Sequence, residues 1–377
     1  MTALEGLLVA DFSRVLAGPL VTMTLADFGA DVVKVEPPGG DETRTWSPPA
    51  DSQGRATFFL AANRNKRSIE LDLKDPDDLE LARELVRRAD VLVENFRPGT
   101  MDRLGLGFEE MSEQNPGLVY CSVSGFGSKG GANLPGYDPL VQAMSGMMSI
   151  TGPPEGEASK VGVALVDVIA GLNATIGVLI ALQERETSGR GQKVESDLMS
   201  SALAALENQA AAWLNTGVLP VRLGNVHPSI EPFTTFDAAD GPVMICVGND
   251  RQFRSLCEVL GEPELAADPR YIDNVDRVEN RDELEAELNI LFSRGTVEDW
   301  VNALHEARVP AGPVNTIDRG FETAEALGLD PIEEIDGVRT ASSPIHLGRT
   351  PAETRLPPPA ENAHSEEIRS WLAATPD

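Results

Sequence analysis

The fold class of this chain is decided by the stretch Leu7-Leu8-Val9-Ala10-Asp11-Phe12 and the two segments that follow it. These are the helical pattern of residues 20–28 and the run Asp31-Val32-Val33-Lys34-Val35. Two short apolar runs, partly β-branched, flank a segment of helical length, which is the pattern of a β-α-β unit. Strands that are connected through a helix lie parallel to each other. The stretch therefore predicts an α/β fold built on a parallel sheet.

The same pattern continues toward residue 150. Asp75 and Pro76 open a helix with a capping side chain and a proline at the first helical position, and Arg87-Arg88 close it where cations favour the helix dipole. Further strands are predicted at residues 91–93 and 118–122. Helices that cover the sheet are predicted at residues 138–149, 168–187 and 197–215.

From about Asn225 the pattern changes to that of a smaller α+β domain. Its predicted strands are residues 233–236 and 243–247, and its predicted helices are residues 250–260, 281–293 and 297–307. The Pro-, Ala- and Glu-rich tail after Pro344 has one short helix at 365–372, and we expect it to pack back on the first domain or to wrap around a partner. The predicted division is a large Rossmann-like domain of residues 1–224, completed by residues 326–377, and a small domain of residues 225–325.

The composition argues against several classes of protein. A formal charge of −29 argues against a nucleic-acid surface, which needs clustered Lys and Arg. Three cysteines and four histidines are too scattered for disulfides or a metal site, so we predict no metal and a reducing, cytoplasmic location. Residues 161–182 are long enough to span a membrane, yet Asp167 interrupts them, so we predict a buried core helix and no membrane association. We read no signal peptide in the first twelve residues.

Common nucleotide and hydrolase motifs are absent from the sequence. The turn after the first strand, Ser13-Arg14-Val15-Leu16-Ala17-Gly18-Pro19, lacks the spaced glycines of a dinucleotide site, and we find no P-loop, G-x-S-x-G or H-E-x-x-H. What remains is a window of basic side chains in an acidic chain, which is either an anion-binding site or a set of solvated residues on helix faces. The window holds Arg64, Lys66, Arg67, Lys74, Arg97 and Arg103.

Asp167 interrupts the most apolar segment of the chain, Val163-Ala164-Leu165-Val166-Asp167-Val168-Ile169. Burying an unpaired carboxylate costs free energy, so this side chain must gain hydrogen bonds, sit at a helix N-terminus or take part in chemistry. The simplest structural role for a lone Asp before an apolar helix is to cap that helix. A helix cap and a reactive carboxylate are both open at this point.

Taken in order, a series of short segments resembles the class III CoA-transferase family, the CaiB/BaiF-like group. The resemblance covers nearly the whole chain, and the order and spacing of the segments make it specific. Its landmarks are residues 11–19, Ala30-Asp31-Val32-Val33-Lys34-Val35-Glu36, Asn63-Arg64-Asn65-Lys66-Arg67-Ser68, Val93-Glu94-Asn95-Phe96-Arg97-Pro98-Gly99, Ser124-Gly125-Phe126-Gly127, Pro135-Gly136-Tyr137-Asp138, Gly162-Val163-Ala164 and Thr187-Ser188-Gly189-Arg190-Gly191-Gln192.

The resemblance implies that Asp167 is the nucleophile. It implies contacts to CoA from Leu71, Lys74, Asn95, Phe96 and Arg103, and an active site lined by Arg14, Leu16, Tyr137, Asp138, His227, Gly248 and Asn249. Two positions depart from the family pattern. Pro37 stands where some members have an arginine, and Pro135-Gly136 replaces a basic CoA contact before Tyr137. The family fold also implies a ring-shaped chain that interlocks with a second copy in a homodimer.

The expected reaction is transfer of coenzyme A from an acyl-CoA to a carboxylic acid through an aspartyl anhydride and an aspartyl-CoA thioester. CoA is a substrate here, and no permanently bound cofactor is expected. The sequence looks most like transferases that use succinyl-CoA or another short dicarboxylyl-CoA, with Arg14 or His227 pairing with the distal carboxylate. Two alternatives are an α-methylacyl-CoA racemase of the same family, in which a histidine stands at the place of Tyr137, and a non-catalytic CoA-binding scaffold.

Overall fold

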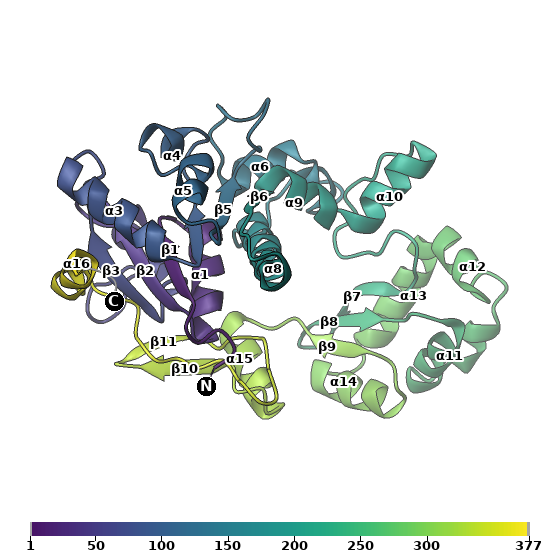
Figure 1. Cartoon of the computed structure of the whole chain (residues 1–377). Coiled ribbons are helices and arrows are strands. Elements are labelled where there is room, and N and C mark those ends of the chain that lie inside the picture. The colour runs from purple at the N-terminus through teal and green to yellow at the C-terminus, as the bar shows by residue number, and fades with distance from the viewer. Residues whose placement is uncertain (1, 375–377) are drawn as a thin grey trace. The chain divides into compact units, whose positions relative to one another are not determined.

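A computed structural model of the chain describes residues 2–374, and Figure 1 labels its helices and strands. These residues form two compact units. The first contains the residues up to 148, residues 160–219 and those from 330 onward, and the second contains residues 149–159 and 220–329. The prediction places residues 149–159 in the large domain. They belong instead to the second unit, where Arg222 donates hydrogen bonds to the carbonyl oxygens of Pro153 and Gly156.

A six-stranded parallel sheet forms the centre of the first unit, with the order β3-β2-β1-β4-β5-β6. This is the order of a doubly wound, Rossmann-like sheet, in which the direction of winding reverses between the first and fourth strands. The predicted α/β fold with a parallel sheet is confirmed. The strands are β1 (Leu8–Asp11), β2 (Asp31–Glu36), β3 (Lys66–Glu70), β4 (Val91–Glu94), β5 (Val119–Ser124) and β6 (Lys193–Asp197).

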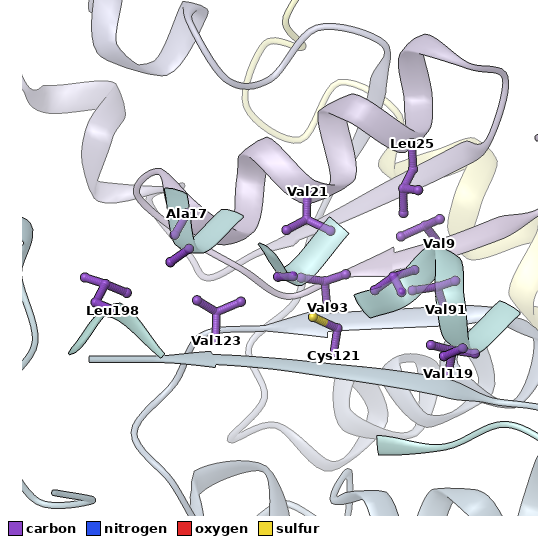
Figure 2. Packing of buried hydrophobic residues seen from close by; sticks show 14 of the residues in the cluster. Val9, Ala17, Val21, Leu25, Val91, Val93, Val119, Cys121, Val123 and Leu198 are labelled. Atoms are coloured by element: carbon purple, nitrogen blue, oxygen red, sulfur yellow. The ribbon is translucent and has the colours of Figure 1, made fainter. Parts of the chain in front are cut away.

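Helices cover both faces of this sheet. On one face, α1 (Ala17–Asp27) and α8 (Leu165–Ser188) pack on the odd-numbered valines of β1, β4 and β5. Figure 2 shows Val21 and Leu25 of α1 above Val93 and Val91 of the sheet. On the other face, α3 (Pro76–Arg88), α5 (Phe108–Gln114) and α16 (Ser365–Ala373) close a second apolar cluster.

The start of α3 is capped as the sequence predicts. The Asp75 side chain accepts hydrogen bonds from the backbone N–H groups of Asp77 and Asp78, Pro76 occupies the first turn, and Arg87 and Arg88 lie in the last turn. The long helix predicted at 197–215 is in fact divided into α9 (Leu198–Ala205) and α10 (Glu207–Thr216), because Glu207 has a φ of 41°. Two short helices, α6 (Asp138–Met144) and α7 (Met147–Ile150), precede α8.

Among residues 2–374, α8 is the helix that is long and apolar enough to cross a membrane, with a mean hydropathy of 2.1. One side of it is buried, with Val166, Ala170, Ala174 and Val178 packed in the core beneath the sheet. This side fits the predicted core helix. The opposite side carries apolar residues that are exposed on the single chain.

The chain returns to the first unit after residue 330 through the hairpin of β10 (Ile332–Ile335) and β11 (Val338–Ala341). Arg64 pairs with Asp27 at 2.6 Å and donates to the Ala341 carbonyl oxygen. Asn65 accepts hydrogen bonds from the N–H groups of Arg355 and Leu356. Arg64 and Asn65 therefore hold the C-terminal segment.

The anion-site interpretation of the basic window is wrong for its first three members. Arg64 is used as just described, Lys66 is buried in an ion pair with Asp11, and Arg67 pairs with Asp31. The reason is that each stands opposite a carboxylate once the β1, β2 and β3 region is folded, so its charge is already compensated within the chain. Only the later members of the window remain candidates for ligand binding.

The second unit has a three-stranded antiparallel sheet, and two of its strands lie close to the positions that the sequence predicts. Phe236 of the sheet stacks on Phe292 with ring centroids 4.9 Å apart, in a core formed by the sheet and its helices. The strands are β7 (Phe233–Ala238), β8 (Gly241–Cys246) and β9 (Ala311–Pro313). The helices are α11 (Asp250–Val259), α12 (Asn274–Glu279), α13 (Arg281–Phe292), α14 (Val297–Glu306) and α15 (Ile317–Ala326).

Candidate active site

The carboxyl ends of β1 and β4 lie side by side at the point where the strand order reverses. In open α/β sheets this crevice is where ligands bind. The loops after the two strands are tied together by one side chain, because Asn95 accepts a hydrogen bond from the Arg14 N–H at 2.8 Å and donates one to the Arg14 carbonyl oxygen at 2.7 Å. Asn95, predicted to contact CoA, thus positions the Arg14 turn in this structure.

A buried set of charges supports the same turn from below. Asp11 accepts a hydrogen bond from the Ser13 hydroxyl at 2.5 Å and pairs with Lys66 at 3.1 Å, and Lys34 donates to the Ser13 carbonyl oxygen at 2.9 Å. Burial alone raises the pKa of Asp11, but Lys66 and Lys34 more than offset it and hold the pKa at about 2. Asp11 is therefore ionised, and the turn that follows it is fixed.

Asp167 opens into a cavity of about 280 Å³ in this crevice. The cavity is lined by the turn after β1, the loop after β4, the end of β5 and the loop before α6. It brings together six residues that the sequence singles out for the site. They are Arg14, Leu16, Asn95, Phe96, Tyr137 and Asp167.

A second cavity, of about 540 Å³, contains four of the five residues expected to contact CoA: Leu71, Lys74, Phe96 and Arg103. We call it the CoA cavity. It shares Arg14 and Phe96 with the Asp167 cavity, and the Arg14 guanidinium carbon lies 4.9 Å from the centroid of the Phe96 ring. The three cationic side chains of this cavity, Arg14, Lys74 and Arg103, fit a phosphate-bearing thioester whose reactive end reaches Asp167.

The Asp167 side chain does not cap α8. The N-cap is Ala164, and Asp167 is the third residue of the helix. None of the residues 2–374 donates a hydrogen bond to its carboxylate. Burial, together with the negative charge of Asp138, raises the pKa of Asp167 to about 7. A carboxylate of this kind is more basic, and so more nucleophilic, than an ordinary Asp, while about half remains ionised at neutral pH.

Asp138 does the capping that Asp167 does not do. It is 3% exposed and its Oδ2 accepts hydrogen bonds from the N–H groups of Val166 at 2.7 Å and Asp167 at 3.2 Å. Its Oδ1 accepts from Gln142 at 2.5 Å, and Gln142 in turn accepts from the Val161 N–H at 2.9 Å. Gln142 is not predicted from the sequence, where only its spacing of four from Asp138 on one helix points to the pair.

We expect Asp138→Asn to move the acidic limb of the pH-rate profile downward. The replacement removes the negative charge that helps to raise the pKa of Asp167, so Asp167 ionises at lower pH. The expected shift of the limb is about one pH unit, measured as kcat/KM between pH 5 and 9. Gln142→Glu is the matched control, because it places a like charge against Asp138 and should move the limb in the opposite direction. Identical limbs in all three proteins would contradict the assignment.

Two glycines shape the wall of the Asp167 cavity. A Cβ built on Gly136 would lie 2.5 Å from the Gly125 Cα, and the reverse holds for Gly125. Only glycine at both positions allows the two backbones to come this close. A basic side chain at position 136 would therefore require the Gly125 backbone to move.

His227 belongs to the second unit, and its local contacts favour a packing role. Its Nδ1 accepts a hydrogen bond from the Ser229 N–H at 3.0 Å, and its ring lies 5.3 Å from that of Phe233. Burial and the nearby Arg281 lower the pKa of His227. A neutral imidazole with one nitrogen already engaged is a weak partner for a carboxylate, so the predicted ion pair with a substrate is not favoured.

Gly248 and Asn249 also lie in the second unit, directly before α11. The Gln252 side chain accepts hydrogen bonds from the Gly248 N–H and the Asn249 amide, while Asn249 caps α11 through the Gln252 N–H. Their donors are therefore in use in this structure. Gln252 is a residue that the sequence gives no reason to single out.

The comparisons with known proteins agree with this geometry. A family model described as CoA-transferase family III matches residues 4–365. The chain belongs to this family. It is 43% identical over 346 residues to the acetyl-CoA:oxalate CoA-transferase of Acetobacter aceti, covering 91% of this chain and 88% of the relative. It is 42% identical to the succinate–glutarate CoA-transferase of Agrobacterium fabrum, covering 98% and 95%.

A solved structure shares the fold over the whole length. A CAIB/BAIF family protein from Brucella suis has a TM-score of 0.90 and 41% identity, covering 98% of this chain and 99% of that one. Within this CoA-transferase, both oxygens of Asp138 accept hydrogen bonds, from Gln142 and from the start of α8, which does not favour a role as the free acid or base of a racemase. Residues 2–374 contain no cluster of three or more His, Cys, Asp and Glu side chains that could hold a metal ion.

Proposed function

We propose that this CoA-transferase carries CoA from a short dicarboxylyl-CoA, such as succinyl-CoA, to a carboxylic acid, with Asp167 as the covalent nucleophile. The observation that carries the proposal is the Asp167 carboxylate itself. It has no partner in the described chain, its pKa lies near 7, and its cavity joins the one that contains Lys74 and Arg103. The Acetobacter and Agrobacterium relatives are named for transfer to or between dicarboxylates, which supports the substrate class.

The reaction divides into two symmetrical halves. An Asp167 oxygen attacks the thioester carbonyl carbon, the C–S bond breaks, and an anhydride and CoA thiolate result. The thiolate attacks the aspartyl carbonyl carbon, which gives an aspartyl-CoA thioester and frees the donor acid as a carboxylate. An acceptor carboxylate then attacks the aspartyl thioester, and the released thiolate takes the new acyl group. Asp167 is regenerated, and no proton is gained or lost.

The residues around Asp167 serve this sequence by fixing positions and charge. Arg14 stands where the CoA cavity meets the Asp167 cavity, so its guanidinium is placed to stabilise the departing thiolate. Asp138 takes up the two amides that would otherwise bind the Asp167 carboxylate and lower its pKa. The Asp167 carboxylate therefore stays basic, although it lies in the first turn of a 24-residue helix, where the helix dipole favours the ionised form.

The test is to incubate the protein with succinyl-CoA and a panel of mono- and dicarboxylic acids, and to follow each new thioester by mass spectrometry. We expect new dicarboxylyl-CoA species to form with free succinate in equal amount. If instead only epimerisation of an α-methylacyl-CoA is observed, the racemase branch of the family replaces this proposal. If no thioester changes with any acid, the proposal is wrong.

We propose further that the protein is a homodimer. Along α8, Leu172, Ile176 and Ile180 are 50%, 56% and 63% exposed on the single chain. On α10 no residue is buried, and Leu214 is 71% exposed. An apolar surface of this extent is rarely left open to water. The racemase and transferase alternatives do not differ on this point, so it is tested separately.

We expect light scattering after gel filtration to give twice the 40.4 kDa mass of the chain, even at nanomolar loading. Ile176→Asp with Ile180→Asp should prevent assembly, because it places two charges on the apolar side of α8. The matched control is Glu184→Gln with Glu186→Gln, which changes two charges at the far end of the same helix and should leave the mass unchanged. A monomeric wild-type protein at micromolar concentration would contradict the proposal.

A further inference from the structure

Glu94 is a buried acid that the proposed reaction does not use. It is the last residue of β4, and its side chain lies on the same face of the sheet as that of Leu92, which belongs to the second apolar cluster. The residue is 6% exposed. A glutamate is seldom buried to this extent without partners, so the groups that contact its carboxylate show what the carboxylate does.

Two donors hold the Glu94 carboxylate. Its Oε2 accepts a hydrogen bond from the Phe96 N–H at 2.8 Å, across a tight turn. The hydroxyl of Ser122, the residue directly opposite on β5, donates a second hydrogen bond. A hydrogen bond to an ionised acceptor is roughly twice as strong as one to a neutral acceptor. The contacts that Glu94 makes are therefore stronger when its carboxylate is ionised.

Phe96 is the residue through which Glu94 reaches the active site. The Phe96 side chain lines both the Asp167 cavity and the CoA cavity, and the Arg14 guanidinium lies over its ring. Asn95, which stands between Glu94 and Phe96, binds the N–H and the carbonyl oxygen of Arg14. Glu94 thus fixes the backbone at Phe96, while Asn95 fixes the Arg14 turn. Glu94 itself lines neither of the two cavities, so it acts on them through Phe96.

Burial decides the charge of Glu94. It raises the pKa of this carboxyl to about 7, although the donors from Ser122 and Phe96 lower it. Lys193 of β6 also lowers the pKa, and Asp102 of α4 (Thr100–Arg103) raises it. Cations and acids are mixed around Glu94, and no single charge outweighs the effect of burial. The other charged side chains that line the same cavity, which has a volume of about 500 Å³, are Arg97, Glu109, Lys129, Glu195 and Asp197.

The charge of Glu94 therefore changes near neutral pH. Below pH 7 the protonated carboxyl holds the Phe96 N–H through a neutral oxygen, and above pH 7 the ionised carboxylate holds it more strongly. A ligand that needs Phe96 in place binds the ionised form more tightly and so lowers the pKa of Glu94. Its affinity rises with pH as a result and reaches its full value above about pH 8.

We propose that Glu94 is a positioning residue of the transfer reaction, whose ionised carboxylate fixes Phe96 where the Asp167 cavity meets the CoA cavity and so strengthens binding of the acyl-CoA. The inference rests on the proposed function, since it takes the cavity that contains Lys74 and Arg103 as the place where CoA binds. It adds a residue outside both cavities, and it makes CoA affinity depend on the charge of that residue.

The test is binding of CoA, measured by isothermal titration calorimetry between pH 5.5 and 8.5. Asp167→Asn is the background, because it removes the other carboxyl of the site with a pKa near 7. As pH drops from 8 to 6, this protein should lose about 3–10-fold in CoA affinity relative to the double variant Asp167→Asn with Glu94→Gln. Ionisation of the CoA phosphates is common to both proteins and cancels in the ratio of their affinities. A ratio that is the same at every pH indicates a merely structural role for Glu94 and overturns the inference.

Two further variants, made in the same background, keep the charge of Glu94. Ser122→Ala removes one donor, which raises the pKa of Glu94 and should move the midpoint of the pH dependence upward. Glu109→Gln is the matched control, because it makes the same change of charge in the wall of the same cavity without touching the hydrogen bond to Phe96. It should leave the pH dependence as it is. A midpoint that stays in place in Ser122→Ala, or one that is lost in Glu109→Gln, contradicts the positioning role.

Steady-state kinetics separate this inference from the proposed function. With succinyl-CoA and a dicarboxylic acid at pH 8, Glu94→Gln should raise KM for the acyl-CoA by about 3–10-fold and leave kcat within about twofold, because the nucleophile is unchanged. Transfer with a KM that is the same in Glu94→Gln and wild type would sink this inference alone. CoA binding that depends on the charge of Glu94, in a protein that exchanges no thioester, would sink the proposed function alone.

Discussion

Asp167→Asn is expected to abolish CoA transfer, with kcat lower by at least about 10³–10⁴-fold, because the amide keeps the shape of the side chain and removes the nucleophile. The measurement is thioester exchange between succinyl-CoA and a dicarboxylate, followed by mass spectrometry. Asp167→Glu is the informative companion, since it retains a carboxylate and displaces it by one methylene. A variant Asp167→Ala that exchanges thioesters at the wild-type rate would exclude the covalent mechanism.

The covalent intermediate gives this prediction a second readout. Hydroxylamine added during turnover should convert the acylated Asp167 to a hydroxamate, and borohydride should reduce the thioester to an alcohol. Both changes are located by peptide mass mapping. The label should depend on acyl-CoA and should be missing from Asp167→Asn. A label on any other residue, with the same dependence, would move the nucleophile.

Asp167 should also cost the protein stability, which distinguishes it from a structural carboxylate. Its pKa is raised from 3.8 to about 7 in the folded chain, so between these values the folded state binds more protons than the unfolded state. Its contribution to stability is therefore present at low pH and is lost as pH rises through 7. Asp167→Asn should thus unfold at a higher temperature than wild type at pH 8 and close to the wild-type temperature at pH 4, and the gain at pH 8 is on the order of 2 kcal/mol.

The strands that can be predicted from the sequence are the four in the middle of the sheet. β1, β2, β4 and β5 are covered by helices on both faces, so they read as apolar runs. The two strands at the edges, β3 and β6, are not predicted. Their sequences, Lys66-Arg67-Ser68-Ile69-Glu70 and Lys193-Val194-Glu195-Ser196-Asp197, are mostly charged or polar. An edge strand with such side chains has no local signal that separates it from a loop.

The residues of the candidate site could likewise be predicted from the sequence only in part. Asp167 is found because it interrupts an apolar run, and that signal is local. The residues that set its chemistry are found only in the fold, because Asp138 reaches across from α6 to the start of α8 and Gln142 supports it.

Clusters of charged residues in the sequence are a poor guide to the site, because the fold decides which charges are compensated within the chain. Lys66 and Arg97 belong to one basic window, and the first is a buried core residue while the second opens into two cavities.

Lys66→Met is expected to lower the free energy of unfolding by about 3–5 kcal/mol, the cost of leaving a buried carboxylate without its partner. Lys66 and Asp11 are both fully buried, and the pair lies under the turn that carries Arg14. Urea unfolding at pH 7, followed by far-UV circular dichroism, measures the loss. Arg67→Gln is the matched control from the next position, where the partner Asp31 is half exposed, and it should cost less than about 1 kcal/mol.

The pH dependence of this loss follows from the charge of Asp11. In wild type its pKa is held at about 2, so the stability it contributes is present above 3.8 and disappears as pH falls through 2. Without Lys66 the pKa of Asp11 rises, and the carboxyl takes up a proton at a much higher pH. The difference between wild type and Lys66→Met should therefore be largest near pH 7 and should shrink toward pH 4. A double variant, Asp11→Asn with Lys66→Met, should recover most of the stability at pH 7, because it removes the uncompensated charge. If the double variant is as unstable as Lys66→Met, packing and not charge accounts for the loss.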